Sequence, residues 1–242
     1  MLSLADIAEL FARKGHEQYA GEPVTQLEHA LQTAHLAQQA GADDELVTAC
    51  LLHDLGHLLQ DLGETPTLRG VDDVHQFASL PFLRGLFGER VLGGIRLHVD
   101  AKRCLCANVP GYEAALSADS KRSLALQGGV FSAEQAEAFM AQAGALDALR
   151  LRQWDDLAKT AGAATPPLQH FLQRAFPHLR RRAAGQHAEG LATVQPIVEV
   201  DRRRIRDRRL GQQQVVGAIG VRHRQAHQTA RVDRRSGGRL AS

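Results

Sequence analysis

The segment Leu51-Leu52-His53-Asp54-Leu55-Gly56-His57 constrains the fold more than any other part of the chain. An apolar helical run leads directly into a histidine and an aspartate, and an aspartate buried among apolar side chains is costly unless it is paired or binds a cation. Imidazole nitrogen and carboxylate oxygen suit Fe, Mn and Zn, and a carboxylate can bridge two ions. The segment therefore favours a metal-binding helical domain, although taken alone it fits equally well a helix end that carries solvated polar residues.

Helical periodicity extends through most of the first 176 residues. Ser3 and Thr25 are suitable N-caps, Thr25 forms a capping-box pattern with Glu28, and Gly41 is a plausible helix stop. We expect a loop at 61–74 and helices at 3–14, 25–39, 43–58, 75–87, 88–99, 111–126, 132–149 and 168–176. Because no convincing alternating strand pattern occurs, the expected fold class is all-α.

The length and the cysteines limit the class of protein. A chain of 242 residues suits one domain with an appendage. No stretch approaches the roughly 20 apolar residues that span a membrane, and no basic segment followed by an apolar run opens the sequence, so we expect neither a membrane partner nor a signal peptide. Cys104 and Cys106 lack the C-x-x-C zinc spacing, and with Cys50 they fit a cytoplasmic protein without disulfides.

The charge divides the chain into two unlike segments. Residues 179–242 contain 15 arginines, no lysine and 5 acidic residues, a net charge of +10, which leaves −8 for residues 1–178 out of the total of +2. The expected division is therefore a domain at 1–178 and an arginine-rich tail at 179–242. The absence of lysine favours an out-of-frame translation of a GC-rich gene, ahead of an inert disordered tail or an arm for nucleic acid or membrane surfaces.

Four further residues of metal-ligand type flank the His53-Asp54 pair: His29, His75, His98 and Asp155. Each has a structural explanation, as a packed histidine, a helix cap, a histidine at a helix C-terminus and a surface carboxylate. Six such residues in the order His, His-Asp, His, His, Asp are much less expected by accident. Together they predict a metal site.

This order resembles the HD-domain superfamily, a set of helical metal-dependent enzymes. The resemblance implies an HD-domain helical bundle with a dinuclear metal site in its core. The first metal would be held by His29, His53, Asp54 and Asp155. Asp54 would bridge to a second metal, held by His75 and His98.

Further segments resemble one branch of that superfamily, the mixed-valence di-iron phosphonate oxygenases that are related to inositol oxygenase. The resemblance covers about residues 5–176. Its motifs are Tyr19-x-Gly-Glu22, Gln26-x-Glu28-His29, His98-x-x-x-Lys102-Arg103, Leu116-Ser117-x-x-Ser120, Gln127-Gly128-Gly129 and Arg152-x-Trp154-Asp155-Asp156-x-Ala158-Lys159. The tail has no counterpart in this resemblance.

The resemblance also implies roles for individual residues. Lys102 and Arg152 would bind the phosphonate, Arg152 as a guanidinium suited to bidentate oxyanion recognition. Ser120 would add a hydroxyl donor, Gln127 would shape the adjoining loop, and His57 would hydrogen-bond the substrate or a metal-bound oxygen.

Tyr19 and Glu22 match a lid in these oxygenases. This pair would occupy the iron site before the substrate arrives and then swing aside, and Glu22 would also receive the substrate's ammonium group. A plain surface turn at Gly21-Glu22-Pro23 is the structural alternative.

The implied reaction uses two iron ions, Fe(II) and Fe(III), and O2 to cleave the carbon–phosphorus bond of 1-hydroxy-2-(amino or trimethylammonio)ethylphosphonate. The products are phosphate and glycine or glycine betaine. The expected partners are this small molecule and O2, and the protein is expected to work as a monomer. A dinuclear HD phosphohydrolase acting on a phosphomonoester or nucleotide uses the same six ligands and is the main alternative. A nucleic-acid binder with a degenerate HD domain is a third, which the intact ligand set disfavours.

Overall fold

The computed structural model describes residues 1–63 and 65–179. The described residues form helices and turns, with two isolated β-bridges in place of any strand. The expected all-α class is therefore confirmed. The arginine-rich segment from residue 180 onwards lies outside the described residues, so its predicted character stays a prediction.

The first two helices begin where their capping residues predict. Ser3 caps α1 (Leu4–Lys14) and Thr25 caps α2 (Gln26–Gln39), each in a complete capping box. A capping box satisfies backbone N–H groups that have no partner inside the helix. The chain between the two helices makes a tight hairpin, with a bridge between Gln18 and Thr25. This hairpin brings Tyr19 over the centre of the molecule.

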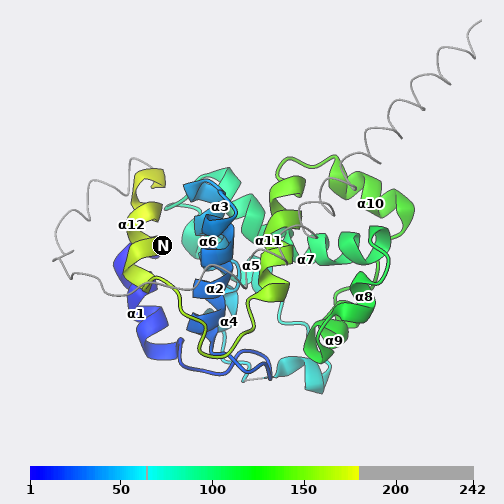
Figure 1. The fold of residues 1–242 in the computed structure, drawn as a ribbon, viewed down its shortest axis with the longest axis horizontal. Coiled ribbons are helices and arrows are strands. Elements are labelled where there is room, and N and C mark those ends of the chain that lie inside the picture. Colours follow the sequence, from blue (N-terminus) through cyan, green and yellow to red (C-terminus); the bar gives the residue numbers. More distant parts are fainter. Residues whose placement is uncertain (64, 180–242) are drawn as a thin grey trace, which may run out of the picture.

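Four helices form the centre of the fold (Figure 1). They are α2, α3 (Asp44–Leu52), α7 (Glu89–Asn108) and α11 (Ala145–Leu157). Helix α7 packs on α3 and α11, and α2 packs on the same two helices. Helices α1 and α12 (Leu168–Ala175) flank this centre on one side, and α8 (Tyr112–Ala115), α9 (Ala118–Leu126) and α10 (Ala133–Met140) lie on the other.

Several expected helices are interrupted in the structure. The expected helix 43–58 divides at His53-Asp54 into α3 and α4 (Leu55–Leu59). The segment 75–87 holds two short helices, α5 (His75–Ala78) and α6 (Leu80–Leu83), and the loop 61–74 contains the 3-10 helix η1 (Pro66–Arg69). Each break leaves polar groups of the chain free to face the centre.

Two other expected helices have different bounds. Gly144, with a φ of 87°, divides the expected helix 132–149 into α10 and α11 because this left-handed conformation cannot continue an α-helix. The helix expected to end at residue 99 continues to Asn108, and α11 continues to Leu157. Both extensions carry residues of the site.

Two apolar clusters stabilise the fold. The larger joins α1, α2, α3 and α12 to the first half of α7, and the smaller joins the second half of α7 to α10 and α11. Leu179, at the end of the described chain, belongs to the larger cluster and pairs with Phe87. Helices α7 and α11 therefore each contribute to both clusters.

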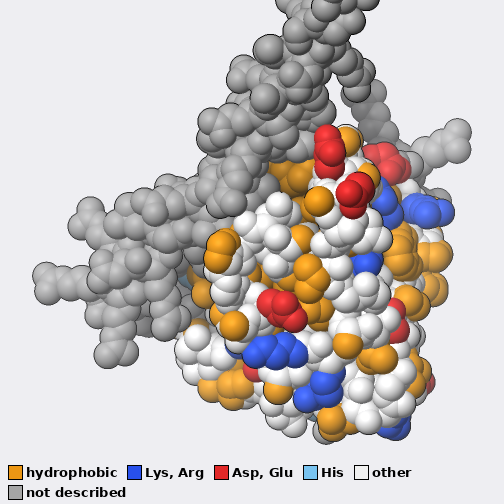
Figure 2. Space-filling view, turned by 90° about the vertical axis from the view of Figure 1, so that its right-hand side faces the viewer, with side chains coloured by type: hydrophobic (Ala, Val, Ile, Leu, Met, Phe, Trp, Pro, Cys, Tyr) orange, Lys and Arg blue, Asp and Glu red, His pale blue; other side chains and the backbone are white. Residues whose placement is uncertain are grey.

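The described helices include no membrane span, and one face of the molecule carries charges of both signs. None of the helices in the described ranges is long and apolar enough to cross a bilayer. Figure 2 shows the side of the molecule that lies at the right in Figure 1, where charges of both signs are scattered among apolar side chains. On the described part of this face, lysine and arginine side chains do not gather into one patch of the kind that nucleic acid requires.

Candidate metal centre

Five separate segments bring buried histidines and aspartates to one point in the core. His29 comes from α2, His53 and Asp54 from the break between α3 and α4, His75 from the start of α5, His98 from α7 and Asp155 from α11. All six are less than one-tenth exposed. The structure thus brings together the six residues that the sequence analysis selected as ligands, and they form two groups able to hold a metal ion.

The first group consists of His29, His53 and Asp155, whose ligand atoms lie within 4.8 Å of one another. His29 Nε2 lies 3.3 Å from His53 Nε2 and 3.4 Å from Asp155 Oδ1. Asp155 Oδ1 is buried and accepts no hydrogen bond from any described residue. A buried carboxylate oxygen normally has a partner, and a bound cation would be such a partner for Asp155 Oδ1.

The second group consists of Asp54, His75 and His98. His75 Nε2 and His98 Nε2 lie 3.0 Å apart, and they lie 3.3 and 3.5 Å from Asp54 Oδ1. Burial lowers the pKa of His98 to about 4, so this ring is neutral and can offer a lone pair. Two imidazoles and a carboxylate make a suitable donor set for a transition metal.

Asp54 belongs to both groups through different oxygens. Its Oδ2 lies 3.4 Å from His29 Nε2 and 3.2 Å from His53 Nε2, whereas its Oδ1 faces the second group. Burial alone would raise the pKa of Asp54, but the nearby imidazoles of His53 and His29 hold it well below its usual range. An ionised carboxylate with one oxygen on each side is the arrangement that a bridging ligand needs.

The opposite nitrogen of each ring fixes how the four histidines point. Every Nδ1 lies 2.7–2.9 Å from an acceptor, so Nδ1 carries the hydrogen and Nε2 faces the centre. The acceptors are the carbonyl oxygens of Ala158 for His29, Cys50 for His53 and Ile95 for His98, and the Asp73 carboxylate for His75.

The donor set therefore fits a cation. Burial alone would lower the pKa of His29, but Asp155 and Asp54 raise it to about 9, so the cluster attracts a proton at the place where a metal would bind. A metal ion satisfies several nitrogen and oxygen lone pairs at once, which a single proton cannot do. The residues present suit two closely spaced metal ions of the Fe, Mn or Zn type.

Gly56 allows the two ligand-bearing segments to approach closely. A Cβ at this position would lie 2.1 Å from the carbonyl oxygen of His75, which no side chain can tolerate. Helix α4 and the start of α5 therefore meet backbone against backbone. This contact brings His75 within reach of Asp54.

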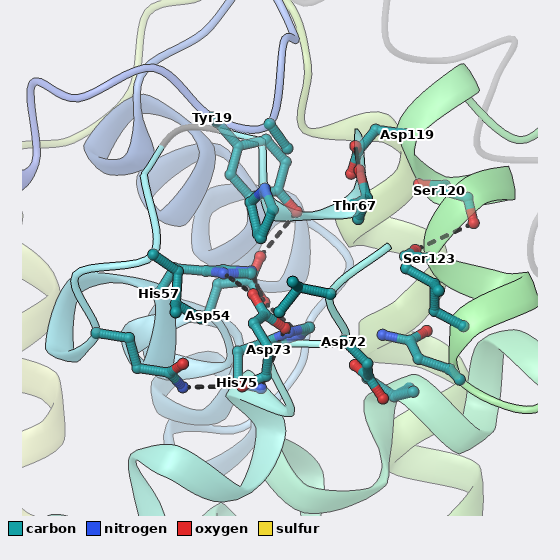
Figure 3. Close-up of a pocket in the computed structure, with 18 of the residues that line it drawn as sticks. Tyr19, Asp54, His57, Thr67, Asp72, Asp73, His75, Asp119, Ser120 and Ser123 are labelled. Carbon is teal, nitrogen blue, oxygen red and sulfur yellow. Dashed lines mark hydrogen bonds and ion pairs between the residues drawn. The ribbon is translucent and has the colours of Figure 1, made fainter. Parts of the chain in front are cut away.

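Tyr19 covers the centre from the hairpin before α2. Its hydroxyl donates a hydrogen bond of 2.8 Å to Asp54 Oδ2, and its ring stacks on His29 with centroids 3.8 Å apart. Figure 3 shows Tyr19 directly above Asp54. Burial and the charge of Asp54 raise the pKa of Tyr19 well above its ordinary value, so this hydroxyl is protonated and donates.

Glu22 lies in the same hairpin but points elsewhere. Its carboxylate pairs with Lys159 Nζ at 3.0 Å, and burial raises its pKa by less than Ser117 and Lys159 lower it. Ala20 and Gly21 both have positive φ, 45° and 72°, which makes the turn tight enough to separate the two side chains. In this structure Tyr19, and not Glu22, occupies the position over the metal ligands.

A pocket of about 330 Å³ opens beside the centre and is lined by Lys102, Ser120, Gln127 and Arg152, as well as by metal-ligand residues. Lys102 is 2% exposed, and its Nζ donates to Ser123 Oγ at 2.8 Å. Burial and the nearby Arg152 lower the pKa of Lys102 to about 7. Such a cation is poorly balanced by its surroundings and would be stabilised by an anionic ligand.

Arg152 is also buried, but its guanidinium is already engaged. It donates to Asp155 Oδ2 at 2.7 Å, to Asp156 and, through Nε, to the hydroxyl of Tyr112 at 3.4 Å. Its two terminal nitrogens therefore each bind a carboxylate. In this arrangement Arg152 places positive charge at the pocket and orients the ligand Asp155, while its fork is not free for bidentate recognition.

Ser120 and Gln127 lie at the two ends of α9 and line the pocket. Figure 3 shows Ser120 at the right of the pocket. Ser117 caps this helix and so places Ser120 in its first turn. Gln127 Oε1 is buried and has no hydrogen-bond partner among the described residues. Both side chains are therefore available to a ligand in the pocket.

His57 lies at the edge of the second group, and sequence reasoning missed the residue that holds it. His57 Nδ1 forms an ion pair of 2.7 Å with Asp73 Oδ2, and its Nε2 lies 3.7 Å from Asp54 Oδ1. Asp73 also binds His75. The expected single helix would have placed His57 on the same face as His53, but the break at Asp54 separates them. The sequence does offer one sign of Asp73, a carboxylate two residues before a histidine in Asp73-Val74-His75.

Comparison with known proteins places this geometry in a family. Residues 27–119 match the model of the HD domain. The chain is 38% identical over 165 residues to the [1-hydroxy-2-(trimethylamino)ethyl]phosphonate dioxygenase (glycine-betaine-forming) of Leisingera caerulea, covering 68% of this chain and 84% of the relative. It is 41% identical over 169 residues to the hydroxymethylphosphonate dioxygenase of Gimesia maris, covering 69% and 84%.

A third relative is the uncharacterized protein L432 of Acanthamoeba polyphaga mimivirus, 31% identical over 168 residues, which cover 68% of this chain and 76% of the relative. The first two matches exceed 30% identity and span most of each relative, and they agree with the buried histidines and aspartates described above. This chain therefore belongs to the family of HD-domain phosphonate dioxygenases.

Proposed function

We propose that this protein uses O2 to cleave the carbon–phosphorus bond of a 1-hydroxyphosphonate, releasing phosphate and a carboxylic acid. The observation that carries the proposal is the buried histidine and aspartate cluster that opens into a pocket with two buried cations, Lys102 and Arg152. The names of the two relatives, both dioxygenases of hydroxyphosphonates, support the same reaction.

The proposed cofactor is a pair of iron ions in the Fe(II)/Fe(III) state. His29, His53 and Asp155 would hold the first, His75 and His98 the second, and Asp54 both. Iron bound there would supply the electron transfer through which O2 reacts. The substrate itself provides the four electrons that reduce O2, because C1 loses its bonds to hydrogen and phosphorus, so no external donor is required.

The residues of the pocket would bind and orient the phosphonate. Lys102 has three donors and can keep its bond to Ser123 while it donates to a phosphonate oxygen. Ser120 and the amide of Gln127 add neutral hydrogen-bonding groups on the same wall. Arg152 contributes its charge and helps to keep Asp155 ionised: burial alone would raise the pKa of that carboxyl, but the guanidinium together with His29 and His53 holds it well below its usual range.

The hairpin would act as a lid. Tyr19 covers Asp54 and excludes water from the ligands, so it must move before a substrate can reach them. The ion pair of Glu22 with Lys159 would hold the closed position. Once released, the Glu22 carboxylate is suited to receive a cationic group on the substrate. His57 is placed to exchange a hydrogen bond with the substrate hydroxyl.

The proposed substrate is 1-hydroxy-2-(amino or trimethylammonio)ethylphosphonate, which would yield glycine or glycine betaine. Hydroxymethylphosphonate, in which hydrogen replaces the substituent on C1, would yield formate. We propose that the protein acts as a monomer, because one chain supplies every metal-ligating residue. A reducing cytoplasm is the proposed compartment, which agrees with the three free cysteines among the described residues.

The test uses the full chain, loaded anaerobically with Fe(II) and given each of the three hydroxyphosphonates with and without O2. We expect phosphate release only with O2, in equal amount to the O2 consumed. Phosphate release without O2, or turnover of phosphomonoesters alone, would instead establish the HD phosphohydrolase. The ratio of kcat/KM among the three phosphonates then identifies the substituent that the pocket accepts.

A further inference from the structure

The Asp73 carboxylate joins the Nδ1 atoms of two histidines that come from different segments. Its Oδ1 accepts from His75 Nδ1 and its Oδ2 from His57 Nδ1, each at 2.7 Å. The two rings stack on each other, with centroids 4.1 Å apart and an angle of 25° between their planes. Figure 3 shows Asp73 close to His75 and below Asp54. One carboxylate therefore orients a ligand of the second group and the histidine that faces the pocket.

The backbone around Asp73 is arranged to keep it there. Val74 has a φ of 44°, a left-handed conformation that a β-branched residue rarely adopts and that must be held by its surroundings. The amide of His75 points back to Asp73 Oδ1 at 3.3 Å, and Gln60 Nε2 donates to the Asp73 carbonyl at 2.9 Å. The tight turn places the side chains at 73 and 75 next to each other.

The four imidazoles of the centre differ in the kind of group that their Nδ1 atoms contact. His29, His53 and His98 direct Nδ1 to backbone carbonyls, which no substitution removes. Among the four, as far as the chain is described, His75 is the one whose Nδ1 meets a side chain. A change at residue 73 therefore acts on the second group and leaves the first group's anchors intact.

We propose that Asp73 is a positioning residue that selectively maintains the second metal site and couples it to His57. The proposal rests on the two metal sites proposed above, but not on the identity of the substrate. Removing a carboxylate that orients a metal-ligating histidine typically lowers metal affinity roughly 10–100-fold. We expect that loss at the second site alone.

The experiment titrates the apo form of the full chain with Fe(II) under anaerobic conditions, in competition with a chelator, and counts bound iron per chain. The variants are Asp73→Asn and Asp73→Glu, with Asp147→Asn as the matched control. Asp147 is a partly exposed carboxylate that pairs with Arg90 at 3.1 Å, outside the metal centre. Circular dichroism and thermal unfolding of each apo protein report on folding.

We expect Asp73→Asn to hold the first iron with unchanged affinity and to bind the second roughly 10–100-fold more weakly. Asp73→Glu, which keeps the charge but not the geometry, should bind the second iron with intermediate affinity, and Asp147→Asn should match the wild type. Equal losses at both sites, or no loss at either, would overturn the proposal. So would variants that are unfolded as apo proteins, because Asp73 would then be needed for folding. Failure of the wild type to bind two ions would instead contradict the metal sites themselves.

Discussion

The cluster of buried histidines and aspartates and the pocket wall beside it are stabilised by different kinds of contact. In the cluster, three of the four imidazoles are anchored by backbone carbonyls of the helices that carry them or lie next to them. On the pocket wall, at Tyr19, Lys102 and Gln127, and at Glu22 in the hairpin that carries Tyr19, the contacts are between side chains, or are missing, as for the oxygen of Gln127. The cluster is therefore built to stay fixed, and the wall is built to exchange its partners when a ligand enters.

The largest effect should come from replacing Asp54, the carboxylate that both groups of the cluster share. In Asp54→Ala both groups lose their shared carboxylate, so we expect loss of both metals and a fall in activity of at least about a thousandfold, the scale of metal-supplied charge stabilisation. Metal content per chain and phosphate release measure this, with Asp147→Ala as the control. Retention of one full metal equivalent by Asp54→Ala would contradict a bridging role.

A smaller effect is expected on the pocket wall, where the proposed substrate and not the metal would bind. Lys102→Met removes a charged donor to the phosphonate, a contact whose loss typically lowers kcat/KM about tenfold to a hundredfold. Metal content should be unchanged. Lys121→Met, on the exposed side of α9, is the matched control. If Lys102→Met lost metal as well, the cluster and the wall would not be independent.

The pH dependence of kcat/KM tests the pocket wall separately from the cluster. Burial and Arg152 lower the pKa of Lys102 to about 7. The charged form is the one that binds a phosphonate, so kcat/KM should fall as pH rises through about 7. Lys102→Arg, whose guanidinium stays charged, should keep kcat/KM level to higher pH. An identical decline in wild type and Lys102→Arg would assign the titration to another group.

The smallest effect should come from the contact that holds the lid closed. Lys159→Met removes the ion pair between Lys159 and Glu22. The side chains of these two residues are 14% and 15% exposed. Partly exposed pairs contribute about 0.2–1 kcal/mol, so KM should change by no more than about fivefold. Limited proteolysis near residues 17–25 should be faster than in the wild type. Unchanged proteolysis would show that Tyr19 alone holds the hairpin.

The difference between the cluster and the pocket wall also explains which features of the site can be predicted from the sequence. The helical class and the caps Ser3 and Thr25 follow from periodicity and from cap residues, which are local features of the chain. The six residues that converge on the cluster are predicted by their order along the chain and by the resemblance of that order to the HD-domain superfamily. The break at His53-Asp54 was missed because apolar spacing continues across it from Leu52 to Leu55. Helical periodicity does not show where polar ligands interrupt it.

Contacts between distant side chains could not be predicted. Nothing near Lys102 in sequence indicates that Ser123 accepts its hydrogen bond, or that Asp73 holds two histidines. Resemblance to a family selected Arg152 for bidentate binding, yet its terminal nitrogens are occupied by Asp155 and Asp156. Such pairings depend on tertiary packing, which a single sequence leaves open.

Gly56 gives the motif His53-Asp54-Leu55-Gly56 a meaning beyond its ligands. Because a methyl group there would overlap the carbonyl of His75, this position sets how closely the segment that carries His53 and Asp54 approaches the segment that carries His75. A side chain at residue 56 would leave every donor atom of the cluster chemically unchanged, but would push His75 away from Asp54. Gly56 thus contributes no donor atom of its own, and yet it determines whether Asp54, His75 and His98 can act as one group.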